Sequence, residues 1–112
     1  GSDLGGGCST MGTLSGGGNI VISVGEQCLL GANAGLGIPL GDRCTIESGL
    51  YLTSGSKVKL LDKEGQSVGV VKARDLASKD DLLFRRNSVT GEIECLANKS
   101  AVALNDELHS NN

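Results

Sequence analysis

Aliphatic residues recur every six positions through the first half of the chain. The first position of each six-residue unit is aliphatic, and the fifth is small in most units. The pattern breaks between residues 10 and 23, where a glycine-rich stretch predicts a loop and 19–24 predicts a strand. The complete units are 4–9, 24–29, 30–35, 40–45, 46–51 and 52–57, and a short unit at 36–39 shifts the phase by two.

This period predicts short strands joined by regularly spaced corners. Because side chains alternate in and out along a strand, position one fills the interior and position five points inward where space is narrow. We expect glycine at position two to supply backbone angles that other residues disfavour. A β-sandwich would space its turns more widely, and a helical solenoid would need longer repeats. The pattern therefore predicts an all-β fold, with a parallel β-helix over residues 1–58 and a loop at about 10–19.

The second half shows ordinary strand and turn patterns. Runs at 57–61 and 68–73 flank a polar turn and predict a hairpin. A third run at 82–88 turns back at Thr90-Gly91 into 92–96, which predicts a second hairpin. The last segment, 101–109, is a candidate for a short helix. We thus predict a second part, residues 59–112, made of β-hairpins and a short terminal helix.

Composition excludes several classes of protein. Glycine is abundant at 18 of 112 residues, and Tyr51 and Phe84 are the only aromatic residues, so the core must consist of thin aliphatic layers. A net charge of −3 argues against a nucleic-acid partner. No apolar run is long enough to span a membrane, and no signal peptide precedes the repeat. We expect a cytoplasmic protein, and an excised piece of a longer chain, because the chain opens in mid-pattern without Met.

The cysteines follow the repeat. Cys8, Cys28 and Cys44 all occupy position five, which indicates a packing role. The four cysteines form no CxxC pair, and His109 is the single histidine, so we predict reduced, buried thiols and no metal site.

Candidate chemistry is concentrated in one basic run. Arg85-Arg86-Asn87-Ser88, with Lys72 and Arg74 in the preceding segment, suits a polyanion such as the phosphates of coenzyme A, although a solvated strand face would look the same. Strand alternation would place Arg85 and Arg86 on opposite sides, so that one of them contacts the ligand. Glu47 occupies position two of its unit, where an acidic residue also has a structural explanation.

Other catalytic patterns are weak. His109 lies three residues from the end, which disfavours Ser/His/Asp catalysis. The glycine-rich stretches lack the Lys-Ser/Thr of a phosphate loop and the strand–helix frame of a dinucleotide site, so we interpret them as backbone geometry.

Longer runs outside the hexads resemble the tetrahydrodipicolinate N-succinyltransferases of the hexapeptide-repeat acyltransferase superfamily. These runs are 5–18, 28–37, 82–88 and 103–109, and the resemblance covers essentially the whole chain as a carboxy-terminal part. It implies a left-handed parallel β-helix and homotrimers with active sites between neighbouring subunits. It also implies transfer of succinyl from succinyl-CoA to the amine of ring-opened tetrahydrodipicolinate, 2-amino-6-oxopimelate, in diaminopimelate and lysine biosynthesis.

The resemblance further implies the succinyl-CoA contacts. It places them at Gly6, Ser9, Ala32, Glu47, Ser48, Gly55, Lys72, Arg85, Arg86, Asn87 and Ser88. The family's catalytic glutamate lies upstream of this chain, so we expect no catalytic residue here, and this piece alone is expected to be inactive. Succinyl-CoA is a co-substrate, and no further cofactor or metal is implied. Backbone N–H groups of the glycine-rich turns are candidate donors to the developing oxyanion.

Two other functions remain open from the sequence. The repeat could be a structural module that trimerises a larger protein. It could also belong to a related acyltransferase with another acyl donor or amine.

Overall fold

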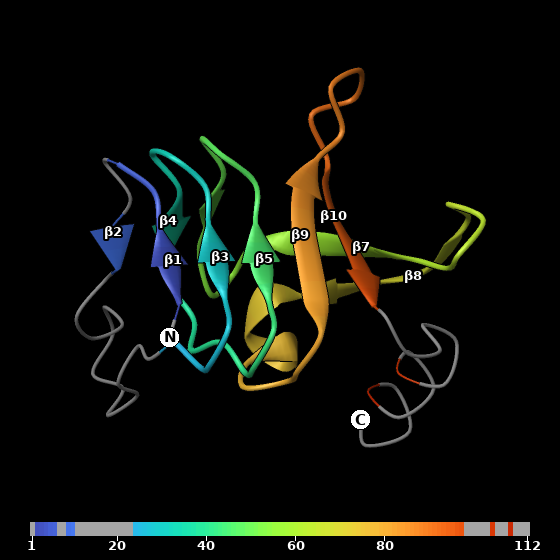
Figure 1. The fold of residues 1–112 in the computed structure, drawn as a ribbon. Helices are drawn as coiled ribbons and strands as arrows, with labels where there is room; N and C mark the ends of the chain where they lie inside the picture. Colours follow the sequence, from blue (N-terminus) through green and yellow to red (C-terminus); the bar gives the residue numbers. More distant parts are fainter. Residues whose placement is uncertain (1, 7–8, 11–23, 98–103, 105–107, 109–112) are drawn as a thin grey trace.

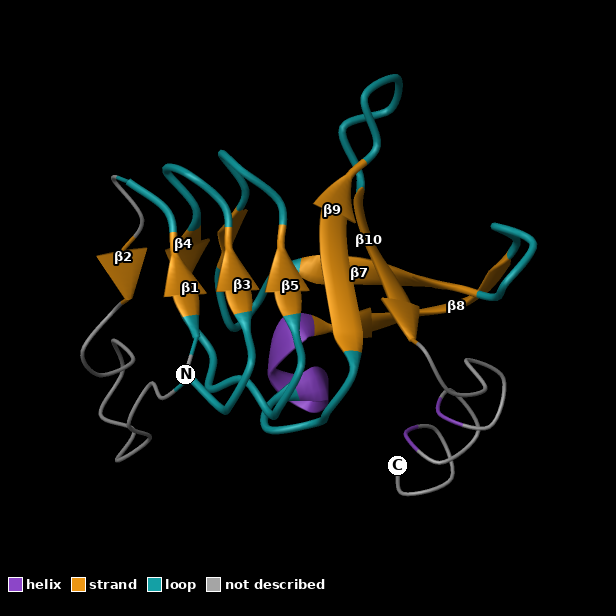
Figure 2. Cartoon of the chain, viewed as in Figure 1, coloured by secondary structure: helices purple, strands orange, loops and turns teal. Residues whose placement is uncertain are grey.

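Short parallel strands stacked coil upon coil form one half of the computed structural model (Figures 1 and 2). The structure describes all residues except 1, 7–8, 11–23, 98–103, 105–107 and 109–112. One side of the stack is formed by β1 (Asp3–Leu4), β3 (Leu29–Leu30), β5 (Thr45–Ile46) and β9 (Leu82–Arg86). A second side is formed by β2 (Ser9–Thr10), β4 (Gly35–Leu36) and β6 (Tyr51–Leu52).

The register accounts for the phase shift seen in the sequence. Leu29 pairs with Thr45 and Gly35 with Tyr51, so successive coils repeat after sixteen residues. Two six-residue units and the short unit at 36–39 make up that length. The short unit is therefore the narrower third side of the coil that begins at Val24. The next coil begins at Leu40, and the Gly25 N–H donates to the Leu40 carbonyl (3.1 Å) where the two coils start.

The interior agrees with the predicted positions. Position-one residues Leu30, Leu36, Ile46 and Leu52 are at most 1% exposed, and so are the position-five residues Ala34, Cys44 and Leu50. Two position-one residues depart from this pattern: Leu4 of the first coil is 58% exposed, and Val24 is partly buried. These aliphatic layers form one continuous core, as the repeat predicted.

The reason for glycine at position two differs from the prediction. A Cβ on Gly31 would lie 2.4 Å from the Ser48 nitrogen of the next coil, and this glycine does not have positive φ. Glycine is therefore required there by the close approach of two coils. Positive φ occurs instead at position four, in Gln27, Asn33, Arg43 and Gly49 (φ 58° to 77°). The corners at 25–27, 31–33 and 41–43 thus combine a left-handed residue with a close contact two positions earlier.

Two hairpins complete the fold. β7 (Lys57–Leu61) and β8 (Ser67–Lys72) form the first, as predicted, and η1 (Ala73–Leu76) leads the chain back to the stack. β9 then pairs with β5 as the next coil and with β10 (Ile93–Ala97) as the predicted second hairpin. β10 also pairs in parallel with β7, so one seven-stranded sheet runs from the stack into the hairpins.

Two predicted segments lie largely outside the described residues. The predicted loop at about 10–19 is one of them, apart from Thr10, which ends β2. The other is the predicted helix at 101–109, of which Leu104 and Leu108 are described. Both of these leucines are helical and pack, partly buried, against the core.

Candidate functional site

The turns that come after β1, β3, β5 and β9 lie side by side along one edge of the stack, at the top of Figure 1. The Asn33 N–H donates to the Gly6 carbonyl (2.9 Å), and the Gly49 N–H donates to the Ala32 carbonyl (2.8 Å). The next coil joins through the Glu47 N–H and the Phe84 carbonyl (3.0 Å). We call residues 5–6, 31–33, 47–49 and 85–88 the arginine corner. It brings together predicted contact residues that are far apart in the sequence.

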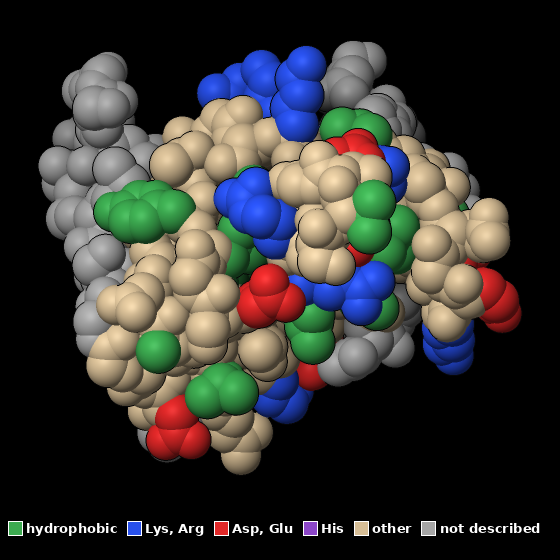
Figure 3. All heavy atoms as spheres, turned by 90° about the horizontal axis from the view of Figure 1, so that it is seen from above, with side chains coloured by type: hydrophobic (Ala, Val, Ile, Leu, Met, Phe, Trp, Pro, Cys, Tyr) green, Lys and Arg blue, Asp and Glu red, His purple; other side chains and the backbone are tan. Residues whose placement is uncertain are grey.

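The arginine corner is hollowed where β9 runs into its turn. The hollow has a volume of about 420 Å³ and is open to solvent. Figure 3 shows Lys and Arg side chains at several places on the face seen from above, with Asp and Glu side chains among them. Five of the residues predicted to contact succinyl-CoA line this hollow. Its lining is Glu47, Arg85, Arg86, Asn87, Ser88, Val89 and Glu94.

Glu94 was missed by the sequence analysis. It is a buried charged residue, 5% exposed, and its carboxylate accepts hydrogen bonds from Arg85 Nε (3.0 Å) and Asn87 Nδ2 (3.2 Å). Arg85 and Glu94 are direct cross-strand partners in the β9–β10 hairpin. The predicted turn at Thr90-Gly91 could not reveal this partner, because counting back from it places Leu96 opposite Arg85, two residues away from the observed register.

Asn87 shapes the hairpin turn. Its Oδ1 accepts the N–H groups of Val89 (2.9 Å) and Thr90 (3.0 Å), while its Nδ2 donates to Glu94. An asparagine that bonds backbone groups two and three residues ahead is typical of a tight turn. The side chain of this predicted contact residue is therefore already engaged within the protein.

Arg85 and Arg86 both line the hollow. Arg86 also donates from Nη1 to the Gly91 carbonyl (2.6 Å), and its N–H lies 3.4 Å from Glu47 Oε1. Arg86 further lines a second hollow of about 560 Å³ on the other side of the β9–β10 hairpin, which includes Lys57 and Lys59. Strand alternation thus separates the two arginines as predicted, but the strand end is close enough to the rim for both to reach the same hollow.

Lys72 and Gly55 lie apart from the arginine corner. Lys72 ends β8 and lines a third hollow of about 430 Å³ with Arg74 and Lys57. Gly55 precedes β7, in a turn that is held to η1 by the bond from the Ala73 N–H to the Ser56 carbonyl (2.8 Å). Arg86 lines the first two hollows and Lys57 the last two, so cations border all three.

One ion pair borders the second hollow. Lys59 Nζ lies 2.9 Å from Glu92 Oε1. Hydrogen bonds from Lys59 and then from Thr90 lower the pKa of the Glu92 carboxyl. This carboxylate is therefore held ionised and offsets part of the basic charge around it.

Three other predicted contact residues have simpler placements. Ala32 and Ser48 are exposed in the turns of the arginine corner, and Gly6 is exposed in the first. Ser9 lies in β2 beside Gly35 of β4, and its side chain is outside the described residues.

Several glycine N–H groups are not available to an oxyanion. The N–H groups of Gly5, Gly31, Gly35 and Gly37 donate to carbonyls of the following coil, over 2.6 to 2.9 Å. For these four glycines the predicted role as oxyanion donors is wrong, because coil stacking already uses the hydrogen atoms.

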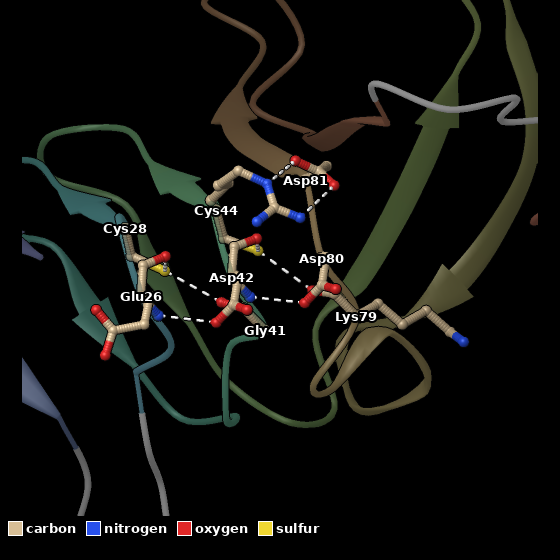
Figure 4. Close-up of polar contacts among 9 residues, drawn as sticks. Glu26, Cys28, Gly41, Asp42, Cys44, Lys79, Asp80 and Asp81 are labelled. Atoms are coloured by element: carbon tan, nitrogen blue, oxygen red, sulfur yellow. Dashed lines mark hydrogen bonds and ion pairs between the residues drawn. The ribbon is translucent and has the colours of Figure 1, made fainter. Parts of the chain in front are cut away.

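The opposite edge of the stack, residues 25–28, 41–44 and 79–82, is the cysteine corner (Figure 4). Cys28 Sγ donates to the Gly41 carbonyl (3.1 Å), and Cys44 Sγ donates to the Lys79 carbonyl (3.2 Å). Burial raises the pKa of the Cys44 thiol to about 11 and that of Cys95 to about 12. The described cysteines, Cys28, Cys44 and Cys95, are buried and unpaired, as the packing role predicted, and Cys8 lies outside the described residues.

Acidic side chains join the coils at the cysteine corner. The Glu26 N–H donates to Asp42 Oδ1 (2.8 Å), and the Asp42 N–H donates to Asp80 Oδ1 (2.7 Å). Arg43 forms a two-point pair with Asp81, through Nε and Nη2. Within the described residues, no group of three His, Cys, Asp or Glu side chains is arranged to hold a metal ion.

Comparison with known proteins points to one family. Residues 21–54 match the family model described as "Hexapeptide repeat of succinyl-transferase". The whole chain is 74% identical to the 2,3,4,5-tetrahydropyridine-2,6-dicarboxylate N-succinyltransferase of Vibrio cholerae and 70% identical to that of Pseudomonas putida. The predicted resemblance to tetrahydrodipicolinate N-succinyltransferases is therefore confirmed along the entire chain. The chain spans 33% of the length of each of these two relatives.

A solved structure supports the same resemblance. A crystal structure described as a 2,3,4,5-tetrahydropyridine-2-carboxylate N-succinyltransferase from Campylobacter jejuni superposes with a TM-score of 0.77 at 39% identity. The match covers 90% of this chain and 29% of that one. In the part of this chain that the structure describes, no helix is long and apolar enough to cross a membrane.

Proposed function

We propose that this chain supplies the coenzyme A-binding part of an N-succinyltransferase. The reaction transfers succinyl from succinyl-CoA to the amine of ring-opened tetrahydrodipicolinate, 2-amino-6-oxopimelate, in diaminopimelate and lysine biosynthesis. One observation carries this proposal. The hollow at the arginine corner gathers Glu47, Arg85, Arg86 and Ser88 in a chain 74% identical to a succinyltransferase of that name.

The charge around the hollows suits the co-substrate. Guanidinium groups bind phosphate and carboxylate oxygens through parallel N–H donors, and acyl-CoA carries both kinds of anion. Arg85 and Arg86 would bind one anionic end of succinyl-CoA, and Lys57, Lys72 and Arg74 border the other two hollows. Gly6, Ser9, Ala32, Ser48 and Gly55 complete the proposed contacts, and Asn87 acts through the turn that it shapes.

The chemistry needs one further group. The amine attacks the thioester carbonyl, the C–N bond forms, the C–S bond breaks and the CoA thiolate leaves, while the amine loses a proton. The proton acceptor proposed for the family is a glutamate upstream of this chain. This chain would therefore bind and orient the acyl donor, and the segment that contains the glutamate would complete the active site.

The proposal includes the finer architecture. The coils are a left-handed parallel β-helix that ends in a short helix, and three copies assemble with each active site between two subunits, in the cytoplasm. The hexapeptide repeat of the succinyltransferase type and the Campylobacter jejuni superposition support this assignment. No cofactor beyond the co-substrate is proposed.

A chimera tests the function. This chain replaces the 112 matching residues of the Vibrio cholerae relative, and succinyl-CoA binding is measured by isothermal titration. We expect saturable binding and release of CoA when the tetrahydropyridine dicarboxylate is added. Titration of this chain alone should also produce heat if it folds without its neighbours.

Two results would contradict the proposal. A folded trimeric chimera that neither binds nor turns over succinyl-CoA would indicate a structural trimerisation module. Faster turnover with acetyl-CoA than with succinyl-CoA would indicate an acyltransferase with another donor.

A further inference from the structure

Glu94 lies on β10, between β9 and β7 in the sheet that runs from the stack into the hairpins. In the register of β9, β10 and β7, Arg85, Glu94 and Lys59 are neighbours across three adjacent strands. Lys59 turns to Glu92, at 2.9 Å, and Glu94 pairs with Arg85, at 3.0 Å. Each cation thus pairs with a different acid, Lys59 with Glu92 before β10 and Arg85 with Glu94 in β10.

The Arg85–Glu94 pair is asymmetric. The Glu94 side chain is 7% exposed, whereas the Arg85 side chain is 42% exposed. Among the described residues, Arg85 donates through Nε only, to Glu94 Oε1. The exposed Arg43 differs, because both Nε and Nη2 are bound to Asp81. Glu94 therefore holds Arg85 from the buried side and leaves the two terminal nitrogens at the rim of the hollow.

Burying the Glu94 carboxylate costs desolvation free energy, which offsets what its ion pair contributes to the stability of the hairpin. Replacing a buried ion pair by apolar residues is often neutral or stabilising, so the pair is weak evidence for a stabilising role. Asn87 Nδ2 donates to the other Glu94 oxygen, so the acid also connects Arg85 to the turn that borders the hollow. This arrangement orients a guanidinium in advance, which reduces the entropy lost when an anion binds.

We propose that Glu94 is a positioning residue that orients Arg85 to bind an anionic group of the acyl-CoA, either a phosphate or the succinyl carboxylate. This inference rests on the proposed function. Glu94 does not itself contact the ligand. It acts through the direction in which it holds the Arg85 guanidinium.

The test compares E94Q, R85A and the double variant in the chimera with the Vibrio cholerae relative. E64Q is the charge-matched control, since Glu64 is an exposed residue in the turn of the β7–β8 hairpin and lines none of the three hollows. Each protein is titrated with succinyl-CoA, acetyl-CoA and CoA. We expect E94Q to weaken succinyl-CoA binding by about tenfold, with a raised KM and kcat within about twofold. We expect E64Q to stay within about twofold of the unchanged chimera.

The double variant separates positioning from general damage. If Glu94 acts through Arg85, E94Q/R85A should bind no more weakly than R85A alone, whereas independent effects would multiply. An equal loss for all three ligands assigns the bound group as a phosphate, and a loss confined to succinyl-CoA assigns it as the succinyl carboxylate. Either pattern supports the proposal.

Two outcomes would overturn it. One is unchanged succinyl-CoA affinity in folded E94Q, and the other is a multiplicative loss in the double variant. If E94Q does not fold, E94D takes its place, because it keeps the charge but withdraws it by one methylene. An affinity of E94D equal to that of the unchanged chimera would equally overturn the proposal. Failure of the unchanged chimera to bind succinyl-CoA would instead contradict the proposed function.

Discussion

The two edges of the coil stack share one backbone design but differ in how they use their side chains. Both edges place a residue with positive φ at position four, namely Gln27 and Arg43 at the cysteine corner and Asn33 and Gly49 at the arginine corner. At the cysteine corner, thiols and carboxylates bond the backbone of the neighbouring coil. At the arginine corner, the coil-to-coil bonds among the described residues are backbone bonds, apart from the one that Glu47 accepts from the Arg86 N–H, and the cations of β9 lie at the rim of a hollow.

This difference shows how a repeat makes room for a ligand. In the arginine corner, Gly5 and Gly31 occupy position two and leave no space between coils. The equivalent residue of the next coil is Glu47, which faces the strand β9 and its hairpin where a further six-residue turn would otherwise stack. The hollow begins at the point where the repeat ends. A structural corner and a candidate binding corner therefore differ in the element that is stacked on their last coil.

The largest expected effect of a single substitution breaks the stacking at the arginine corner. Gly31→Ala would place a Cβ 2.4 Å from the Ser48 nitrogen, so the coils must separate. We expect a loss of about 3 kcal/mol of stability, because overpacking against backbone cannot relax by a side-chain rotation. Thermal unfolding of the chimera with and without Gly31→Ala measures this loss of stability.

Gly6→Ala is the control for that substitution. Nothing lies within 4 Å of a Cβ on Gly6, and the next coil already has alanine, Ala32, at the same position. Its stability should stay within about 0.5 kcal/mol. Equal losses for the two variants would contradict the close-contact explanation.

The second effect separates binding from stability. In R85A/R86A, succinyl-CoA affinity should fall by about 100-fold, since two charge-assisted donors leave the hollow. Isothermal titration of the chimera measures this affinity. Unchanged affinity in a folded double variant would exclude the arginine corner as the anion site.

The third effect concerns alkaline pH. The pKa values of Cys44 and Cys95, about 11 and about 12, lie above the ordinary thiol value of 9.0. The folded state keeps these protons when the unfolded state has lost them, so their stabilising contribution is complete below pH 9 and is lost as pH rises towards 11–12. We expect each thiol to contribute a loss of roughly 2 kcal/mol between pH 8 and pH 10.5, or about 4 kcal/mol for the two together.

Denaturant unfolding of the chimera at the two pH values measures that loss. The C44A/C95A variant should show a smaller decrease between pH 8 and pH 10.5 than the unchanged chimera. An equal decrease in both proteins would assign the alkaline sensitivity to other groups.

The smallest expected effect comes from removing Arg43, a cation of the cysteine corner, for comparison with the arginines of β9. Arg43 pairs with Asp81 on an exposed surface, where ion pairs contribute little. R43A should lower the melting temperature slightly and leave succinyl-CoA affinity within about twofold. A loss of affinity as large as that of R85A/R86A would remove the distinction between the two corners.

Much of the fold could be predicted because the repeat is a local signal. Positions one and five identified buried residues such as Leu30 and Cys44, and turn residues identified both hairpins. The role of glycine at position two was misjudged, because the close contact of Gly31 with Ser48 involves the next coil and is invisible to a single turn.

The candidate site was predictable only in part. Arg85 to Ser88 are adjacent in the sequence and formed a recognisable cluster, and the family resemblance added Glu47. Glu94 was not found, since an acid in a strand has no local signature and acquires its role only from the residue across the hairpin.

By itself the sequence determined the period, the identity of the buried layers and the family that this chain resembles, because each of these depends on residues that are close along the chain. The tertiary structure decided which turns lie side by side, which arginine nitrogens stay unbound among the described residues and where the stack opens into a hollow. These features depend on register between strands as distant as β5 and β9, and register is set by the packing of the whole core.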